Sequence, residues 1–543
     1  MQYSWRAATA LVILLAAAAR LYNIDFGLPA VNDPDELMFE LGALRMLRTG
    51  TLNPGWFGHP ATTTMYGLAL ANLASFGVGR LLGWYHSQRD FADAIFADPS
   101  LVILPGRLLM AAFGVLTVGL TARFGKLLHN QRTGLIAALL LAVSPVAVHW
   151  AQVIRSDIMA SAFMMLCLLA TLRFMRAGQR RDLVISGVWL GIAVATKWPF
   201  AIAGAGLLAV LASQLANGTA TPRQTLGRAA GFLGVAAGTL VLTSPYLVLA
   251  HDVVLRNLQG EAQAQHLGAT GGWFAENAIW YIRGPLLSAI GLPGLVLSLA
   301  GLVLAARHRE TALIVLPVMA LFFLVLVSQH IVWERWILPL LPLAALLAAI
   351  SMDRMAHWAA SRMKPAATPR GGLAAISLLA VACSVPLAIT AVFEARARAN
   401  DTRQIAARWA ASRIPPGSTV IIEHFGFDLY ARPWRILFPL GTAGCVDARA
   451  MLAGKIDYAK IEKARGGRSN VDYGTVDPAL AETCSADFAI LTQADRYLLE
   501  KNRFHAEAQA YQKLLNRGVT EELFLPLHNI SAGPTVRIVR FQK

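Results

Sequence analysis

The chain has 543 residues, of which 56% are hydrophobic and only 15% are charged, and its formal net charge is +16. A soluble domain carries about 25% Asp, Glu, Lys and Arg, so this composition argues against a soluble enzyme. The same figures exclude an intrinsically disordered chain. In so apolar a chain, excess Lys and Arg indicates the cytoplasmic loops of a membrane protein rather than a nucleic-acid-binding surface.

The charged residues are distributed unevenly along the chain. Residues 1–394 contain 27 basic and 17 acidic residues, whereas residues 395–543 contain 21 basic and 15 acidic residues. The second part therefore has the charge density of a soluble domain, and its length is a usual domain size. We predict a polytopic α-helical membrane domain over 1–394, followed by a soluble α/β domain over 395–543.

Twelve apolar stretches are candidates for membrane helices, because a bilayer crossing takes about 20 mostly apolar residues. They lie near 7–22, 61–83, 101–122, 133–149, 157–174, 183–197, 199–216, 228–250, 285–306, 311–328, 335–351 and 372–393. We expect about 11–13 transmembrane helices in all.

The basic residues predict the direction of these spans, since Lys and Arg in short loops mark the cytoplasmic side. Five clusters fit that side together, and they lie at 123–132, 173–181, 223–228, 307–309 and 354–370. Arg6 places the N-terminus inside as well. The polar stretch 61–83 breaks the alternation, so we interpret it as a juxtamembrane or re-entrant helix, which leaves eleven crossings. The C-terminal domain then lies outside, in the periplasm of a Gram-negative cell.

Ionisable residues gather on this predicted outer side, in the loop 23–100 and in several shorter loops. Pro34 is favourable at the start of a helix, which places Asp35 and Glu36 in its first turn, where the helix dipole favours acidic side chains. Taken alone, this triplet is better explained by an ordinary helix start. The outer loops also supply Arg, Lys and His, however, and a cavity ringed by such cations suits an anionic lipid headgroup such as a phosphate.

The outer-loop motifs, taken in order, resemble those of the family 39 glycosyltransferases. The first match runs from Asp35-Glu36 through Thr49-Gly50 to Phe57-Gly58-His59-Pro60. The later matches are Ser144-Pro145, His149, Arg155-Ser156-Asp157, Ala195-Thr196-Lys197-Trp198 and Trp333-Glu334-Arg335-Trp336. This family has the GT-C fold and includes protein O-mannosyltransferases and lipid A aminoarabinose transferases, and the motifs span most of residues 1–394.

The resemblance implies a sugar donor carried on a polyprenyl phosphate, which is undecaprenyl phosphate in a bacterium. It implies that Asp35 is the general base and that Glu36 orients the loop or assists binding. The residues expected to contact the donor phosphate are His59, Lys197, Arg256 and Arg335, and those expected to line the cavity are Arg155, Asp157 and Trp336. Trp336 stands where the family usually has Tyr, so a phosphate contact from a Tyr hydroxyl is not expected here.

Each cationic assignment has a structural alternative. Lys197 can extend from a helix end toward the interface, Arg335 can pair with Glu334, and Arg256 rests on its location alone. We expect no metal and no other cofactor, because Arg and Lys can neutralise the carrier phosphate. The sequence contains no Walker motif or Rossmann fingerprint, which argues against a nucleotide-sugar donor.

In the C-terminal domain the sequence predicts a helix over 400–413, strands over 419–423, 488–492 and 536–541, and a longer helix over 496–515. Cys445 and Cys484 would lie in an oxidising compartment, where they can form a disulfide. We find no catalytic constellation in this domain.

The sequence supports two functions. The first is an inverting glycosyltransferase in a bacterial inner membrane, which transfers a sugar from a polyprenyl-phosphate donor to an extracytoplasmic lipid A, glycan, lipid or protein. The second is a non-enzymatic carrier or flippase for a polyprenyl phosphate. The polar residues concentrate on the outer side instead of spreading through the spans, which favours the enzyme.

Overall fold

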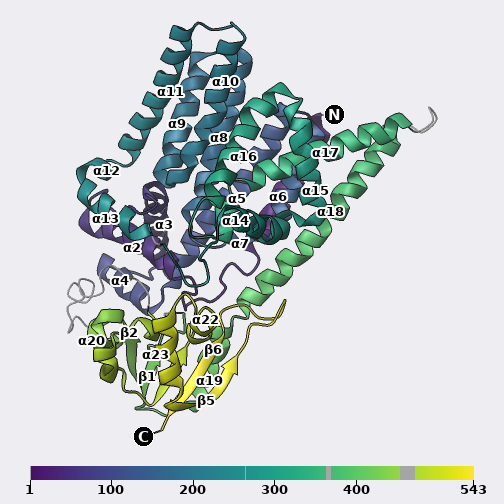
Figure 1. Ribbon diagram of the computed structural model, residues 1–543. Helices are drawn as coiled ribbons and strands as arrows, with labels where there is room; N and C mark the ends of the chain where they lie inside the picture. The colour runs from purple at the N-terminus through teal and green to yellow at the C-terminus, as the bar shows by residue number, and fades with distance from the viewer. Residues whose placement is uncertain (1, 263, 363–368, 425, 453–470, 543) are drawn as a thin grey trace.

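The computed structural model describes residues 2–262, 264–362, 369–424, 426–452 and 471–542. A helical domain occupies one end of the molecule, and a smaller α/β domain, formed by the C-terminal residues, lies at the other (Figure 1). Helix α18 (Pro369–Ala399) joins the two. The predicted boundary between residues 394 and 395 falls inside this helix. Residues 363–368, part of the last predicted basic cluster, lie outside the described residues.

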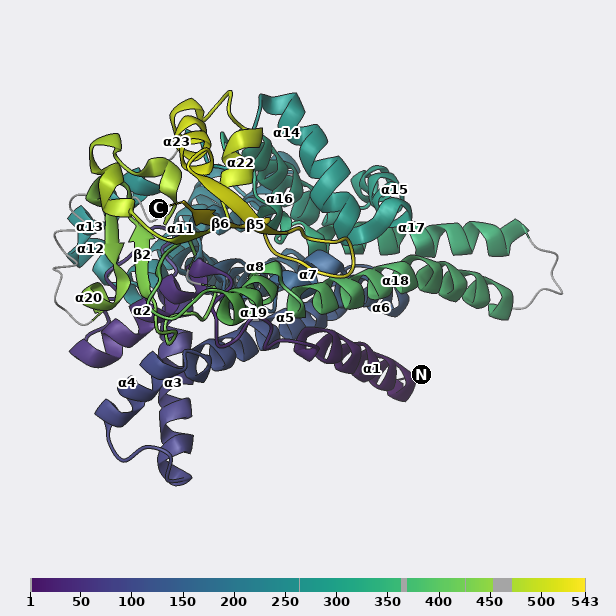
Figure 2. The same ribbon diagram turned by 90° about the horizontal axis from the view of Figure 1, so that it is seen from below.

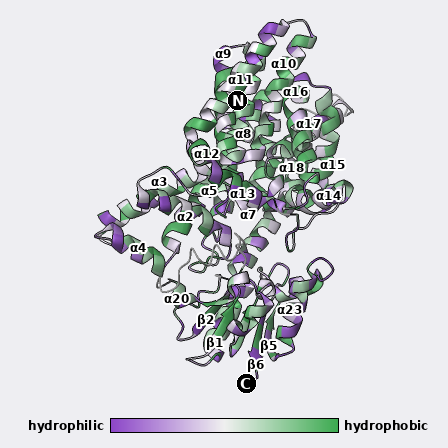
Figure 3. Ribbon diagram, turned by 60° about the vertical axis from the view of Figure 1, so that its left-hand side comes forward, coloured by the Kyte–Doolittle hydropathy of each residue, from purple (hydrophilic) through white to green (hydrophobic). Residues whose placement is uncertain are grey.

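Seven helical stretches in the described part of the chain are long and apolar enough to cross a membrane. They are Ser100–Leu128 (α5), Ser156–Ala177 (α8), Trp198–Ala216 (η1 and α10), Pro222–Thr243 (α11), Phe274–Ala306 (α14, η2 and α15), Arg309–Val327 (α16) and Ile376–Arg413 (α18 and α19). Figure 3 shows the apolar colouring of this bundle. The predicted fold class is confirmed.

Further helices coincide with the other predicted spans. They are α1 (Gln2–Leu21), α3 (Thr62–Leu81), α6 (Gln131–Val143), α9 (Arg180–Thr196) and α17 (Leu341–Arg362). Helix α3 packs on α2 (Pro34–Thr49) and α5, and with α4 (Gln88–Ala97) it stands to one side of the bundle in Figure 2. The number of crossings and the role of 61–83 stay predictions.

Small residues allow the helices of the bundle to pack closely. A Cβ atom at Gly134 would lie 2.3 Å from the Ala122 carbonyl oxygen, and one at Gly301 would lie 2.3 Å from the Leu347 carbonyl oxygen. Close backbone approach at small residues is typical of membrane helices, whose association relies on van der Waals packing. The side chains of α8 lie almost entirely inside the resulting core.

The loops on the side of the bundle that faces the C-terminal domain contain short helices whose ends have clear causes in the sequence. Asp33 caps α2 by accepting a hydrogen bond from the Asp35 N–H, and Pro34 occupies its first position, as predicted. Ser87 and Asp90 form a capping box at α4. The remaining helices are α7 (Pro145–Trp150), α12 (Tyr246–Leu249), α13 (His251–Glu261) and the 3₁₀ turn η3 (Glu334–Ile337).

The C-terminal domain contains a six-stranded mixed sheet with the order β3-β2-β1-β4-β6-β5. Strands β1 (Thr419–Ile422), β2 (Arg435–Pro439) and β4 (Phe488–Leu491) are parallel, whereas β3 (Cys445–Asp447), β5 (Gly518–Phe524) and β6 (Val536–Phe541) pair antiparallel to their neighbours. Helices α19 (Thr402–Arg413), α22 (Ala494–Leu499) and α23 (His505–Leu515) pack around this sheet.

Most predicted elements of this domain are confirmed. Strands β1, β4 and β6 and helix α19 lie where expected, and Cys445 and Cys484 form a disulfide. The predicted helix over 496–515 is two helices, because the chain turns between Leu499 and His505. Strands β2, β3 and β5 were not predicted, and the exposed side chains of β5 give it little apolar alternation.

Candidate functional site

Arg155, at the start of α8, binds two carboxylates at the start of α2. Its Nη2 donates to both oxygens of Asp33 at 2.8 and 2.7 Å, and its Nη1 donates to Asp35. Burial would raise the pKa of Asp33, but the charge and hydrogen bonds of Arg155 outweigh burial and lower that pKa. Asp33 therefore remains ionised, while the Asp35 side chain stays 39% exposed.

Glu36 has a different environment from its neighbour Asp35. Its carboxylate is fully buried and accepts two hydrogen bonds from Arg107, at 2.9 Å from Nε and 2.7 Å from Nη2. The Ile154 N–H donates a third, at 3.1 Å. This bidentate pair attaches the start of α2 to α5 and to the chain just before Arg155. The geometry agrees with a role for Glu36 in orienting the loop.

A second buried ion pair joins α8 to the junction after α9. The Lys197 Nζ lies 2.7 Å from both oxygens of Asp157, and both side chains are buried. The Lys197 segment also pairs with the His59-Pro60 segment: the Trp198 N–H donates to the His59 carbonyl oxygen at 2.8 Å, and the Ala61 N–H donates to the Thr196 carbonyl oxygen at 3.2 Å. Two predicted phosphate ligands, His59 and Lys197, are thus held beside each other.

The His59 ring packs against Trp56 and Phe39, with centroid distances of 5.0 and 5.9 Å. Burial, together with the positive charges of Lys197, Arg335 and Arg155, lowers the pKa of His59 well below its usual value. The ring is therefore neutral. Its Nδ1 has no hydrogen-bond partner among the described residues.

Arg335 lies in η3 with its guanidinium over the ring of Trp333, 4.5 Å from the centroid. It is 7% exposed, and its side chain has no ion pair or hydrogen bond to any residue that the structure describes. The nearby charges include Arg155 and the carboxylates of Asp157 and Asp35. Its predicted alternative partner, Glu334, instead accepts a hydrogen bond from the Trp150 Nε1 at 2.9 Å.

The structure gives less support to two other predicted residues. Arg256, on α13, is 65% exposed and pairs with Asp252 one turn away at 3.1 Å. No described contact connects it to the other predicted ligands, so its role stays a prediction without geometric support. Trp336 packs partly buried against the membrane-domain core.

The structure adds residues that the sequence motifs did not identify. The Trp150 ring lies near both Arg155 and Arg335, with its centroid 5.8 and 5.9 Å from their Cζ atoms. Glu261, at the end of α13, lies so close to Gly58 that a Cβ there would be 2.9 Å from its Oε1. Burial and Asp35 raise the pKa of Glu261, although Arg335 and Lys197 partly offset them. The place of Glu261 in a predicted outer loop was the one available signal, whereas Trp150 gave no signal of its own.

The C-terminal domain packs against the segment that directly precedes α2. The Arg403 Nη1 donates to the Asn32 carbonyl oxygen at 2.6 Å, and the side chains of Gln404 and Asn32 exchange hydrogen bonds of 2.8 and 3.0 Å. His424, after β1, is held in this interface, where burial and the charge of Arg403 lower its pKa to about 3. The domain thus contacts the residue directly before Asp33.

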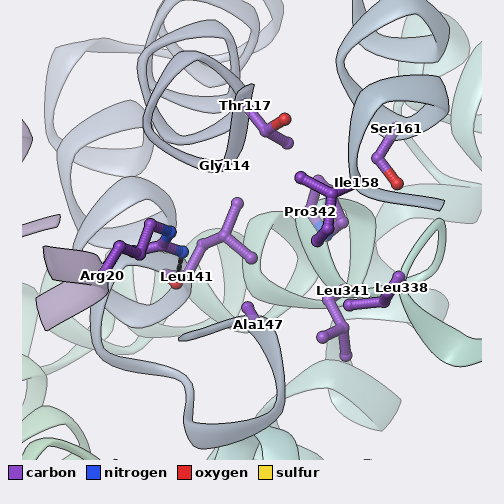
Figure 4. A pocket seen from close by; sticks show the side chains of 10 residues that line it. All are labelled: Arg20, Gly114, Thr117, Leu141, Ala147, Ile158, Ser161, Leu338, Leu341 and Pro342. Carbon is purple, nitrogen blue, oxygen red and sulfur yellow. Dashed lines mark hydrogen bonds between the residues drawn. The ribbon is translucent and has the colours of Figure 1, made fainter. Parts of the chain in front are cut away.

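A small cavity of about 20 Å³ lies beside the helices that carry Asp157 and Arg335, and Figure 4 shows its lining. Its volume accommodates about one water molecule, so it is too small for a sugar or a phosphate. At its edge, the Arg20 Nη1 donates to the Ala142 carbonyl oxygen at 3.0 Å and so caps the end of α6. Among the described residues, no three His, Cys, Asp or Glu side chains form a set of metal ligands.

Comparisons with known proteins show which families and structures this chain is similar to. Residues 92–249 match the family model of the dolichyl-phosphate-mannose-protein mannosyltransferases. A search of the curated proteins found no match. Structural matches cover nearly the whole chain. ArnT from Cupriavidus metallidurans bound to undecaprenyl phosphate matches with a TM-score of 0.53 and 14% identity, over 99% of this chain and 97% of that chain.

The apo form of the same ArnT matches with a TM-score of 0.55 and 15% identity, over 98% of each chain. The archaeal oligosaccharyltransferase AglB from Archaeoglobus fulgidus, in complex with an inhibitory peptide and a dolichol-phosphate, matches with a TM-score of 0.51 and 13% identity, over 94% of this chain and 71% of that chain. The chain therefore has the GT-C fold of a multi-pass integral membrane protein, and its residues 92–249 are similar to the dolichyl-phosphate-mannose-protein mannosyltransferase family.

Proposed function

We propose that the protein is an inverting glycosyltransferase, which moves a sugar from a polyprenyl-phosphate donor to an acceptor at the outer face of a bacterial inner membrane. In this proposal the N-terminus is cytoplasmic, and the C-terminal domain, residues 395–543, is periplasmic. Three findings support it: the GT-C fold, the family match over residues 92–249, and a cluster of carboxylates and cations between the outer loops.

The observation that carries the proposal is the unpaired charge of the buried Arg335 side chain. A buried guanidinium is costly unless an anion or strong acceptors compensate it, yet Arg335 makes no ion pair within the described residues. A phosphate from the donor would supply the missing anion, and a guanidinium binds phosphate through a planar fork. Lys197 and the neutral His59 ring, joined through their backbones, would add donors to the same group.

Asp35 is the proposed general base. Its carboxylate pairs with Arg155 but is partly exposed, whereas Glu36 is fully buried against Arg107, so Asp35 is the carboxylate of this pair that an acceptor can reach. Asp35 would accept the proton of the acceptor hydroxyl or amine as that group attacks the anomeric carbon. The bond from this carbon to the phosphate oxygen breaks in the same displacement, and the polyprenyl phosphate leaves stabilised by the cations. One displacement inverts the anomeric configuration.

The partners in this proposal are a polyprenyl-phosphate sugar and a lipid, glycan or protein acceptor. The matched structures include one bound to undecaprenyl phosphate and one in complex with dolichol-phosphate and an inhibitory peptide. These are properties of those proteins. They support the same class of lipid carrier here, but they do not distinguish among the acceptors.

The test compares the wild type with Asp35→Asn, purified in detergent and supplied with radiolabelled polyprenyl-phosphate sugars and membrane extract. We expect transfer by the wild type and a loss on the order of 10²–10⁴-fold in Asp35→Asn, the usual contribution of a positioned base. Donor binding is measured in parallel and should survive. Asp93→Asn, an exposed carboxylate of the same outer loop, is the matched control and should transfer normally.

The outcomes separate the two functions that the sequence allowed. Equal transfer by wild type and Asp35→Asn would refute the general-base assignment. Donor binding by both proteins with no transfer to any component of the extract would favour a lipid carrier. Arg335→Gln tests the phosphate site independently, since it should weaken donor binding, whereas Asp35→Asn should not.

A further inference from the structure

Residues 525–531, in the loop between β5 and β6, leave the sheet and run along the outer end of α18 (Figure 1). Hydrogen bonds attach this loop to the end of α18. The Ala532 N–H donates to the Ala397 carbonyl oxygen at 2.9 Å, and the Asn400 Nδ2 donates to the Ile530 carbonyl oxygen at 3.2 Å. The position of this loop is therefore fixed relative to a membrane helix.

This loop presents three large apolar side chains outward. Leu525, Leu527 and Ile530 are 53%, 54% and 60% exposed. Water-soluble surfaces rarely carry contiguous apolar patches unless a partner covers them. The proposed catalytic cluster makes no use of these residues.

Helix α18 continues the same apolar surface. Its exposed residues recur at intervals of three and four, which places them on one face of the helix. They are Leu378, Val381, Val385, Ile389, Val392 and Phe393. Because α18 belongs to a helical stretch long and apolar enough to cross a membrane, an exposed apolar face on it is suited to contact with lipid. Its outer members, Ile389 and Phe393, line a common groove with Leu527.

The groove between α18 and the loop has a volume of about 480 Å³. Apolar side chains line part of it, and Thr390, Glu394, His528 and Asn529 supply polar groups. An apolar side next to a polar side is the chemistry of the boundary between acyl chains and headgroups.

We propose that residues 525–531 insert Leu525, Leu527 and Ile530 into the outer leaflet, and that bilayer phospholipids fill the groove beside α18. The continuity of the exposed apolar face from α18 onto the loop carries this proposal. Burial of these side chains in lipid removes their apolar surface from water. The loop then holds the C-terminal domain against the membrane on the side of α18, independently of the proposed transferase activity.

The experiment places an environment-sensitive fluorophore at Leu527→Cys and reconstitutes the full-length protein into vesicles of phosphatidylcholine and phosphatidylglycerol. The native cysteines are either paired, at Cys445 and Cys484, or buried, at Cys167 and Cys383, so labelled wild type measures the background. Val519→Cys is the matched control. Val519 is 48% exposed on the same hairpin, but it pairs with Arg540 at the end near the C-terminus, remote from the helical domain (Figure 1).

We expect a blue shift of the fluorophore at Leu527 and a loss of its emission when the lipid acyl chains are brominated. The fluorophore at Val519 should show neither effect. If Leu527→Cys does not give monodisperse protein, Ile530→Cys replaces it. A fluorophore on the loop that behaves like the one at Val519 would overturn the proposal, whether or not the protein transfers sugar.

Discussion

Asp35 and Glu36 are adjacent in the sequence, but their surroundings suit them to different tasks. Glu36 is enclosed by Arg107 and the Ile154 N–H, whereas the partly exposed Asp35 shares Arg155 with Asp33. Since Asp33 accepts both hydrogen bonds from Nη2, it balances much of the Arg155 charge. The first turn of α2 thus combines a fixed anchor with an accessible carboxylate.

The anchoring role of Glu36 predicts a large loss of stability in Glu36→Gln. This change leaves the fully buried Arg107 without a charged partner, which typically costs about 3–5 kcal/mol. We expect a clear drop in the thermal unfolding midpoint of the purified protein in detergent. Glu521→Gln, which removes a surface pair with Arg540, is the control and should cost only about 0–1 kcal/mol. Equal midpoints for the two variants would contradict the anchoring role.

The ion pair of Asp157 and Lys197 predicts that removing both charges restores much of the stability lost when Lys197 alone is removed. Lys197→Met leaves the Asp157 carboxylate buried and unpaired, so we expect destabilisation of about 3–5 kcal/mol. The double variant Asp157→Asn/Lys197→Met removes both charges and should recover much of the lost thermal stability. It should not recover sugar transfer if Lys197 contacts the donor phosphate. A double variant as unstable as the single one would show that the ion pair is not the cause.

At the scale of elements, one carboxylate organises the end of the parallel strands in the C-terminal domain. Glu423 directly follows β1 and accepts hydrogen bonds from the N–H groups of Tyr473, Thr492 and Gln493 at 2.9, 2.7 and 3.1 Å, and another from the Tyr511 hydroxyl. Burial nevertheless raises its pKa to about 7, against the effect of these hydrogen bonds. Glu423 joins β1 to β4 and α23 without an opposite charge.

This raised pKa predicts how the stability of the sheet depends on pH. Between about pH 4.5 and 7 the folded state binds more protons at Glu423 than the unfolded state does, so stability from this group falls as pH rises. Relative to Glu423→Gln, the wild type should lose roughly 3 kcal/mol across this window. The effect of His424, whose pKa is lowered, has the opposite sign but is common to both proteins.

Hydrogen exchange of β1 and β4, compared between the two proteins at matched pH, measures this difference. Because intrinsic exchange rates are equal at one pH, the ratio of the two rates reports the relative opening free energy. A difference that stays constant from pH 4.5 to 7 would show that Glu423 is already ionised throughout.

The sequence predicted the elements better than their contacts. The helices and three of the strands follow from apolar length and periodicity, which are local properties. Arg107 and Trp150 gave no comparable signal, because their contacts arise only when α2, α5, α7 and η3 meet. Arg256 illustrates the opposite case, since its outer-loop position suggested a role that its exposed pair with Asp252 does not support.

At the scale of the whole molecule, the C-terminal domain contacts the membrane domain on two sides of the proposed site. Arg403 and Gln404 bind Asn32, and the Glu500 carboxylate accepts a hydrogen bond from the Gly268 N–H at 2.8 Å. Asn32 directly precedes Asp33, the carboxylate that shares Arg155 with Asp35. The docked domain therefore helps to position the start of α2.

This arrangement predicts that loosening the docked domain slows transfer without removing any group from the proposed site. In Arg403→Ala/Gln404→Ala, Asn32 loses its partners, and the loop that carries Asp33 and Asp35 becomes free to shift. A displacement of about 1 Å at a reacting group can reduce the rate on the order of 10²-fold, so we expect a loss of that order in kcat with little change in donor binding.

The matched control is Arg408→Ala/Arg413→Ala, which alters two exposed residues of the same helix and should keep full activity. Limited proteolysis between α18 and α19 provides a readout besides activity, because a loosened domain should expose this segment to cleavage sooner. Full transfer by Arg403→Ala/Gln404→Ala, together with faster cleavage, would show that the domain covers the site without positioning Asp35. In that case, selection of the acceptor would be the role left to the C-terminal domain.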